Sequence, residues 1–149
     1  MYSRILVPVD GSLASDRGLA EAIKLAKALH AQLCLVHVVN ELMPIWVDTA
    51  VYAVDIIKLV HEAGEAILED ALEEVRRHEQ DAEVRLLESI GGRASDAIVK
   101  HAKEWQADLI AMGTHGRRGV TRLVLGSDAD NVMHTTPVPV LLVRATSDA

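Results

Sequence analysis

Short apolar segments alternate along this chain with segments whose apolar residues recur at helical spacing, and this alternation limits the possible folds most. Five segments are typical of strands; they are Ser3–Val9, Leu33–Val39, Ala82–Ser89, Ala107–Met112 and Val138–Arg144. Strands that alternate with helices predict a parallel sheet with right-handed crossovers. The predicted fold class is therefore α/β: a single open five-stranded parallel sheet with helices on both faces, of the Rossmann-like kind.

Four helical patterns lie between these strands. In the first, apolar residues at 19–29 share one face, and Ser12 is a suitable N-cap. The second would form a helix about 45 Å long, which is long for a small domain, so we expect a late start or an interruption near Gly64. The third and fourth patterns are Ser95–Trp105 and Asp128–Thr135.

Composition excludes several classes of protein. The 149 residues suit one domain, 1–149, and half of them are apolar, which argues against disorder. A single cysteine, Cys34, excludes an internal disulfide. No apolar stretch has the length of a membrane span and no signal-peptide pattern is present, so we expect no membrane insertion and a cytoplasmic location.

Charge is unevenly distributed. The net charge of −7 disfavours binding to DNA or anionic membranes, and a 3% aromatic content without Phe gives few stacking platforms. Residues 1–83 carry a net −8, whereas residues 84–126 carry a net +3 that includes Arg117, Arg118 and Arg122. This basic stretch is either a solvated loop or an anion site on an acidic molecule.

The basic stretch contains a glycine pattern: Gly113-x-x-Gly116, nine further residues, and then Gly126-Ser127. It is neither a Walker A loop nor the dinucleotide fingerprint. Glycines nevertheless let backbone N–H groups approach a ligand, and a helix N-terminus favours phosphate. Open parallel sheets bind ligands at the carboxyl ends of their strands, where this pattern begins.

A purely structural interpretation of the same pattern stays open. The glycines would then be turn residues and the arginines solvated. Ser127 would be an N-cap that forms a capping box with Asp130.

Five segments, in order and spacing, resemble the universal stress protein (UspA) family. They are ILVPVDGS at 5–12, LVHVV at 35–39, GGRASDAI at 91–98, ADLIAMGTHGRRG at 107–119 and LGSDADNVMHTTPVPVLLV at 125–143. The spacing G-2x-G-9x-G-[ST] is the signature of that family's ATP-binding branch. The resemblance implies an adenine nucleotide alpha hydrolase-like fold, with a nucleotide at the carboxyl edge of the sheet.

The resemblance also implies roles for individual residues. Adenosine would lie against the end of the first strand and against Val38, and the phosphates would lie against the glycine pattern. The candidate binding residues are Pro8, Val9, Asp10, Val38, Met112, Gly113, Gly116, Arg117, Gly126 and Ser127. The implied ligand is ATP, or AMP or ADP, with Mg²⁺ or Mn²⁺ as candidate metals and Asp10 as a candidate metal ligand.

Asp128 departs from the family pattern, in which this position is commonly small or apolar. A carboxylate beside phosphate is repulsive, so Asp128 points away, meets a cation or weakens affinity for a triphosphate. Its alternative role is to stabilise the helix dipole. A response-regulator pocket would need several carboxylates at the end of the first strand, where Asp10 stands alone. We expect His37 to be a packed core or site-wall residue rather than a ligand, and Cys34 to be inert.

The last strand, Val138–Arg144, would attract another chain if it formed a bare sheet edge, and a two-fold pairing is the simple solution. The resemblance implies the same homodimer.

Three functions stay open. The first is a nucleotide-dependent regulatory or stress-response module. The second is a slow ATPase or phosphotransferase, for which no convincing base is visible, since His115 lacks suitable partners. The third is an interaction protein without nucleotide.

Overall fold

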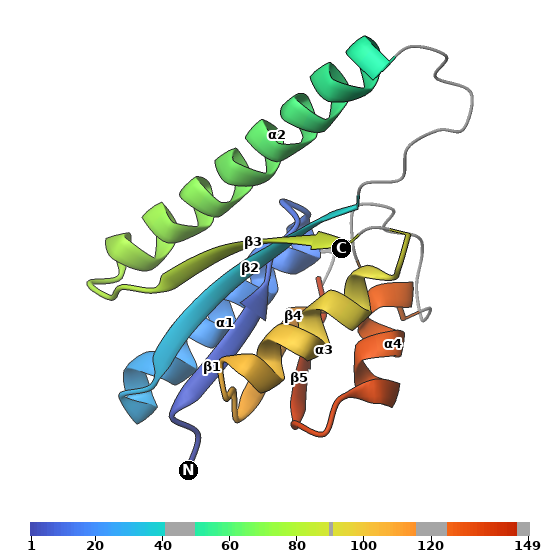
Figure 1. Ribbon diagram of the computed structural model, residues 1–149. Coiled ribbons are helices and arrows are strands. Elements are labelled where there is room, and N and C mark those ends of the chain that lie inside the picture. Colours follow the sequence, from blue (N-terminus) through green and yellow to red (C-terminus); the bar gives the residue numbers. More distant parts are fainter. Residues whose placement is uncertain (41–49, 90, 116–124, 146–149) are drawn as a thin grey trace.

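The computed structural model describes residues 1–40, 50–89, 91–115 and 125–145, which form five parallel strands and four helices (Figure 1). The strands are β1 (Arg4–Pro8), β2 (Gln32–Asn40), β3 (Glu83–Ser89), β4 (Leu109–Gly113) and β5 (Val140–Val143). The helices are α1 (Leu13–Leu29), α2 (Ala50–Arg77), α3 (Ala94–Glu104) and α4 (Ser127–Thr135). The strand order is β3-β2-β1-β4-β5, and every pairing is parallel. The predicted fold class is confirmed.

Each face of the sheet carries its own apolar core. Successive residues of a strand point to opposite faces, so Ile5 packs with α1 and α2, whereas Leu6 packs with α3 and α4. Both side chains are fully buried. The central strands are covered on both sides, which explains why they are continuous apolar runs rather than alternating ones.

Helix α2 is a single 28-residue helix, and the expected late start or interruption near Gly64 is wrong. A Cβ at Gly64 would lie 2.9 Å from His37 Cδ2 and 2.9 Å from Leu86 Cδ1, so glycine lets the helix pass close to the sheet. At about 1.5 Å per residue the helix is about 42 Å long, and its first turns project beyond the sheet (Figure 1). None of the described helices combines the length and apolar character of a membrane span.

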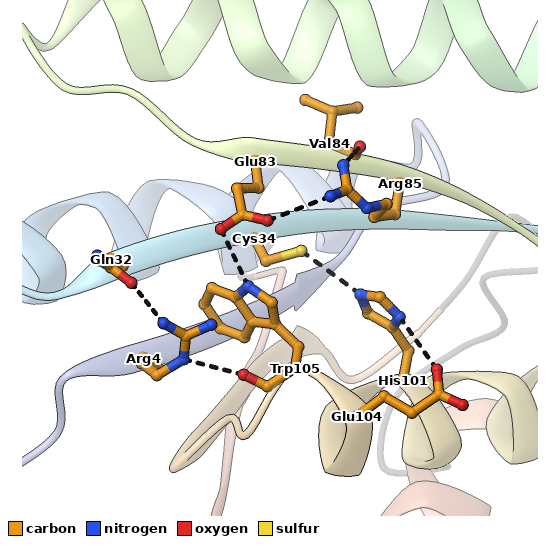
Figure 2. A network of polar contacts seen from close by, with 9 residues as sticks. All are labelled: Arg4, Gln32, Cys34, Glu83, Val84, Arg85, His101, Glu104 and Trp105. Atoms are coloured by element: carbon orange, nitrogen blue, oxygen red, sulfur yellow. Dashed lines mark hydrogen bonds and ion pairs between the residues drawn. The ribbon is translucent and has the colours of Figure 1, made fainter.

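Polar contacts tie the strand starts together at the amino edge of the sheet (Figure 2). The Trp105 indole N–H donates to Glu83 Oε1 at 3.2 Å, and the Arg4 guanidinium lies 4.1 Å from the centre of the Trp105 ring. Arg4 also donates to the Trp105 carbonyl and to Gln32 Oε1. These contacts join β1, β2 and β3 to the end of α3.

Cys34 lies within this amino-edge network and is fully buried. Its Sγ is 3.8 Å from His101 Nε2. Burial raises the pKa of the Cys34 thiol to about 12, with Glu83 acting in the same direction. Burial also lowers the pKa of His101, which leaves that ring a poor activator of the thiol. The expectation that Cys34 is inert agrees with this environment.

Candidate functional site

The strand order changes direction between β1 and β4 at the centre of the sheet. After β1, the chain adds β2 and then β3 on one side of the sheet, whereas β4 and β5 lie on the other side of β1. Ligands of open α/β sheets bind in the crevice outside the carboxyl ends at this switch point. Leu6 pairs with Ile110 in the parallel register, so the segments that follow Pro8 and Gly113 leave the sheet side by side.

A tight hydrogen-bonded turn connects β1 to α1. The Asp10 N–H donates to Ser15 Oγ at 3.0 Å, and Asp10 Oδ1 accepts the Ser12 N–H at 2.9 Å. Ser12 is the N-cap of α1, as predicted, because its Oγ accepts the Ser15 N–H. Gly11 has φ of 80°, a conformation that favours glycine. The Asp10 carboxylate therefore shapes this turn in addition to any role toward a ligand.

His37 supports the same turn from β2. Its Nδ1 lies 2.7 Å from the Val9 carbonyl oxygen, and since a carbonyl only accepts, Nδ1 carries the proton and donates. The Val9 N–H in turn donates to the Val36 carbonyl at 2.8 Å. Both backbone groups of Val9 are thus held by β2, and His37 is a half-buried packing residue, as expected.

The end of β4 packs unusually closely against α1. A Cβ at Gly113 would lie 2.5 Å from both the carbonyl carbon and the carbonyl oxygen of Ala14. A Cβ at Gly18 would lie 2.9 Å from the Gly113 nitrogen. Two glycines are therefore needed where α1 crosses β4, and this packing role is separate from any contact between Gly113 and a ligand.

The start of α4 is fixed to the end of β4. The Gly126 N–H donates to the Thr114 carbonyl at 2.6 Å, and the Thr114 N–H donates to the Val143 carbonyl at 3.0 Å. Gly126 is the N-cap of α4, and no side-chain cap bond is formed. The alternative in which Ser127 caps the helix is therefore wrong, since Ser127 is its first residue. The helix N-terminus is held beside the switch point.

Hydrogen-bonding groups that lack a partner among the described residues gather here. The N–H groups of a helix's first turn lack intrahelical acceptors. In α4 these groups belong to the residues directly after Gly126, whose own N–H is bonded to Thr114. Thr114 Oγ1 is a buried hydroxyl without a hydrogen-bond partner among the described residues, and Thr114 is 8% exposed. Such groups normally find a protein, water or ligand partner. The arrangement suits a small anionic ligand.

Two carboxylates modify this electrostatic environment. Partial burial raises the pKa of Asp128, and the negative charge of Asp10 raises it further. The other acidic residue in the first turn of α4, Asp130, lies 3.4 Å from His134 Nδ1. The positive helix terminus is accompanied by negative side chains.

A metal ion at this edge would need some of its ligands from a bound molecule in addition to the described side chains. Among residues 1–40, 50–89, 91–115 and 125–145, no group of three or more His, Cys, Asp or Glu side chains is arranged to hold one. Mg²⁺ commonly takes one or two carboxylates together with substrate phosphates. The Asp10 carboxylate fits such a shared site, in which a phosphate-bearing ligand would supply the remaining oxygens.

The structure brings most of the predicted site residues to one edge of the sheet. Eight of them lie at the ends of β1, β2 and β4 or the start of α4: Pro8, Val9, Asp10, Val38, Met112, Gly113, Gly126 and Ser127. Val9 and Met112 are buried in the cores on opposite faces, and Val38 is half-buried. Gly116 and Arg117 lie outside the described residues.

Sequence reasoning missed two features of this edge. The Gly18–Gly113 contact depends on where α1 crosses the sheet. The one sequence signal for this contact was Gly18 itself, a glycine inside an otherwise regular helical pattern. Thr114 was passed over because its role comes from backbone pairing with Val143 and Gly126. Its position directly after Gly113 was the available signal.

Taken together, the strand order, the two covered faces and the helix N-terminus at the switch point define an open α/β protein of the Rossmann-like class. The family model described as "Universal stress protein family" matches residues 1–144. The chain belongs to the universal stress protein family.

Known relatives agree with this assignment. Universal stress protein MJ0531 of Methanocaldococcus jannaschii is 33% identical over 145 residues, which cover 97% of this chain and 83% of the relative. A solved structure of a universal stress protein in complex with cAMP is 30% identical, with a TM-score of 0.72, and covers 97% of this chain and 99% of that one. The universal stress protein from Archaeoglobus fulgidus in complex with dAMP is 26% identical, with a TM-score of 0.65, at 95% and 98% coverage.

Proposed function

We propose that this chain binds an adenine nucleotide at the carboxyl edge of its sheet. The observation that carries the proposal is the hydrogen bond from the Gly126 N–H to the Thr114 carbonyl, which holds the N-terminus of α4 beside the switch point. Phosphate is stabilised at such helix termini by free N–H groups and the helix dipole. The bound cAMP and dAMP of two relatives support the same ligand class.

In this proposal the ends of three strands receive the nucleoside. Pro8, Val9 and Asp10 would line the adenosine, Val38 would meet the adenine, and Met112 and Gly113 would flank the nucleotide. The phosphates would lie against Gly126 and Ser127, together with Gly116 and Arg117. When Mg²⁺ or Mn²⁺ accompanies the phosphates, it supplies positive charge to them, and Asp10 is the residue that would hold it.

The nucleotide serves a regulatory purpose in this account. We infer one domain over residues 1–149 that acts in the cytoplasm as a nucleotide-dependent stress-response module. A ligand regulates only through a difference in its affinity for two states or two complexes. The candidate second partner is another copy of the chain, because β5 lies at the edge of the sheet and Leu141 on it is 37% exposed. A homodimer through Val138–Arg144 would cover this edge.

Calorimetric titration with ATP plus Mg²⁺, and separately with AMP, tests the nucleotide site. Ser127→Asp adds a carboxylate at an exposed position where the helix dipole favours it, so folding is preserved while phosphate is repelled. Ser127→Asn is the matched uncharged control. We expect saturable binding by the wild type and the Asn variant, and at least about tenfold weaker binding by the Asp variant. Absence of heat at millimolar nucleotide in all three proteins would contradict the proposal.

Light scattering coupled to gel filtration tests the dimer. Leu141→Glu places a charge on β5, and Met133→Glu places one on a residue of α4 that is somewhat more exposed than Leu141. We expect a dimeric wild type, a monomeric Leu141 variant and a dimeric Met133 variant. A monomeric wild type at high micromolar concentration would refute pairing through β5.

A further inference from the structure

We propose that the pocket between α1 and α2 binds a linear aliphatic polyamine. The ammonium groups would lie at the acidic walls of the pocket, and the methylene groups would lie on its apolar floor. The proposal goes beyond the nucleotide site and does not depend on it, because the carboxylates that it uses are on α1 and α2.

The floor of this pocket is part of the apolar core. The pocket has a volume of about 350 Å³ and lies over the face of the sheet that α1 and α2 cover. Its floor is formed by three buried side chains of that core, Val9, Leu19 and Ala71. A volume of this size is at the lower end of the range for small-molecule sites, about 300–1,000 Å³. Methylene groups of a ligand would therefore lie against an apolar surface there.

The walls of the pocket carry carboxylates from both helices. Asp16 is on α1, whereas Asp70 and Glu74 lie one turn apart on α2. Glu74 has a counter-ion, because Arg77 Nη1 lies 3.3 Å from Glu74 Oε2. Within residues 1–40, 50–89, 91–115 and 125–145, neither Asp16 nor Asp70 forms an ion pair. Two carboxylates from different helices, each without a counter-ion in the described part of the chain, therefore border an apolar cavity.

The electrostatic environment of Asp16 agrees with this arrangement. Partial burial raises the pKa of Asp16, and the charges of Asp10, Glu74 and Asp70 raise it further. A cation in contact with the carboxylate would have the opposite effect on its pKa. A bound cation would therefore reduce the repulsion among these carboxylates.

A polyamine suits these features better than a metal ion or a protein segment. No three His, Cys, Asp or Glu side chains in the described part of the chain are arranged to hold a metal ion, so the carboxylates of the pocket do not converge on one point. An extended cation can reach separate carboxylates and cover the apolar floor between them. A protein partner would also have to cover the surrounding surface, where the exposed neighbours Arg17 and Glu69 are charged, unlike the centre of most protein interfaces.

Calorimetric titration with spermidine tests the pocket, without nucleotide and at an ionic strength of about 0.1 M, which screens exposed charges. We expect saturable binding that Mg²⁺ at the same concentration does not displace. Asp16→Asn and Asp70→Asn should each weaken binding about fivefold or more. Ala20→Met should weaken binding as well, because the longer side chain enters the pocket from α1 without a change of charge. The control is Glu69→Gln, which removes one charge from an exposed position beside Asp70 and should change the affinity less than about twofold.

The outcomes distinguish a pocket from general attraction of cations to an acidic protein. Equal weakening in Glu69→Gln, or complete displacement by Mg²⁺, would overturn the proposal, because binding would then follow net charge. Unchanged affinity in Ala20→Met, with the fold verified by circular dichroism, would overturn it too, since the ligand would not occupy the cavity. Absence of saturable spermidine binding by the wild type would contradict it directly. These titrations contain no nucleotide, so their result is independent of the nucleotide site.

Discussion

The α-carbon of Gly113 sits so close to Ala14 that a Cβ there would lie 2.5 Å from the Ala14 carbonyl oxygen. Gly113 is the last residue of β4 and Ala14 is in the first turn of α1. The two segments that flank the switch point are thus in direct backbone contact. A substitution at Gly113 moves α1, and loss of ligand binding in such a variant would not by itself identify a phosphate contact.

Gly113→Ala should lower the free energy of unfolding by at least about 2 kcal/mol, because the methyl group meets backbone that can move only if the helix moves. Gly92→Ala is the matched control, since its Cβ would make only an ordinary contact with Ser89 Oγ at 3.4 Å. Urea denaturation followed by circular dichroism measures both. Equal stability of the Gly113 variant and the wild type would contradict the close packing.

Asp108 should stabilise the fold in a pH-dependent way. Its carboxylate accepts the Ser3 N–H and hydroxyl, each at 2.8 Å, and the Arg4 N–H at 3.0 Å. Burial acts to raise the pKa of Asp108, but these hydrogen bonds outweigh it and hold the pKa below the ordinary value of 3.8. A lowered folded-state pKa contributes stability above pH 3.8 that is lost as the pH falls through the folded-state value.

Asp108→Asn should therefore cost about 1 kcal/mol at pH 7, and the difference should shrink as the pH falls below 3.8. Urea titrations at pH 7 and pH 3 give the two values. Glu69→Gln, at an exposed position of α2, controls for the removal of one negative charge. A difference that stays constant across this range would disprove the charged hydrogen bonds.

Cys34 should not react with thiol reagents in the folded protein. The side chain is fully buried, and at pH 8 a pKa of about 12 leaves about one thiolate in ten thousand. Ellman's reagent should give no signal over minutes in buffer and one thiol per chain in 6 M guanidinium, which is about the concentration that unfolds most domains. Rapid reaction in buffer would mean that the amino-edge network opens.

The sheet was predictable because strands buried on both faces have nearly continuous apolar sequences. The run at 33–39 became β2, and Ser12 became the N-cap of α1. Gly64 misled the prediction, because a glycine inside a helical pattern signals either a break or a close crossing. Only the neighbours of Gly64 on the sheet, His37, Val39 and Leu86, distinguish a break from a close crossing.

The sequence predicted where the candidate site lies in the fold, but it did not predict most of the contacts within the site. Alternation of strands and helices located its edge, and the glycine spacing located two of its segments. The capping of α4 depended on a backbone bond between Gly126 and Thr114, which no local pattern encodes. The effect of the Asp10 charge on the pKa of Asp128 likewise arises from the fold, since these residues are far apart in the sequence.

The most direct test of the central claim is to map AMP onto ¹⁵N-labelled protein by NMR. We predict saturable shifts of backbone amides at the ends of β1, β2 and β4 and in the first turn of α4, with Thr114 and Ser127 among them. The Trp105 indole N–H, bonded to Glu83 at the opposite edge, should not move. No shift at millimolar AMP, or shifts centred on Trp105, would contradict a nucleotide site at the carboxyl edge.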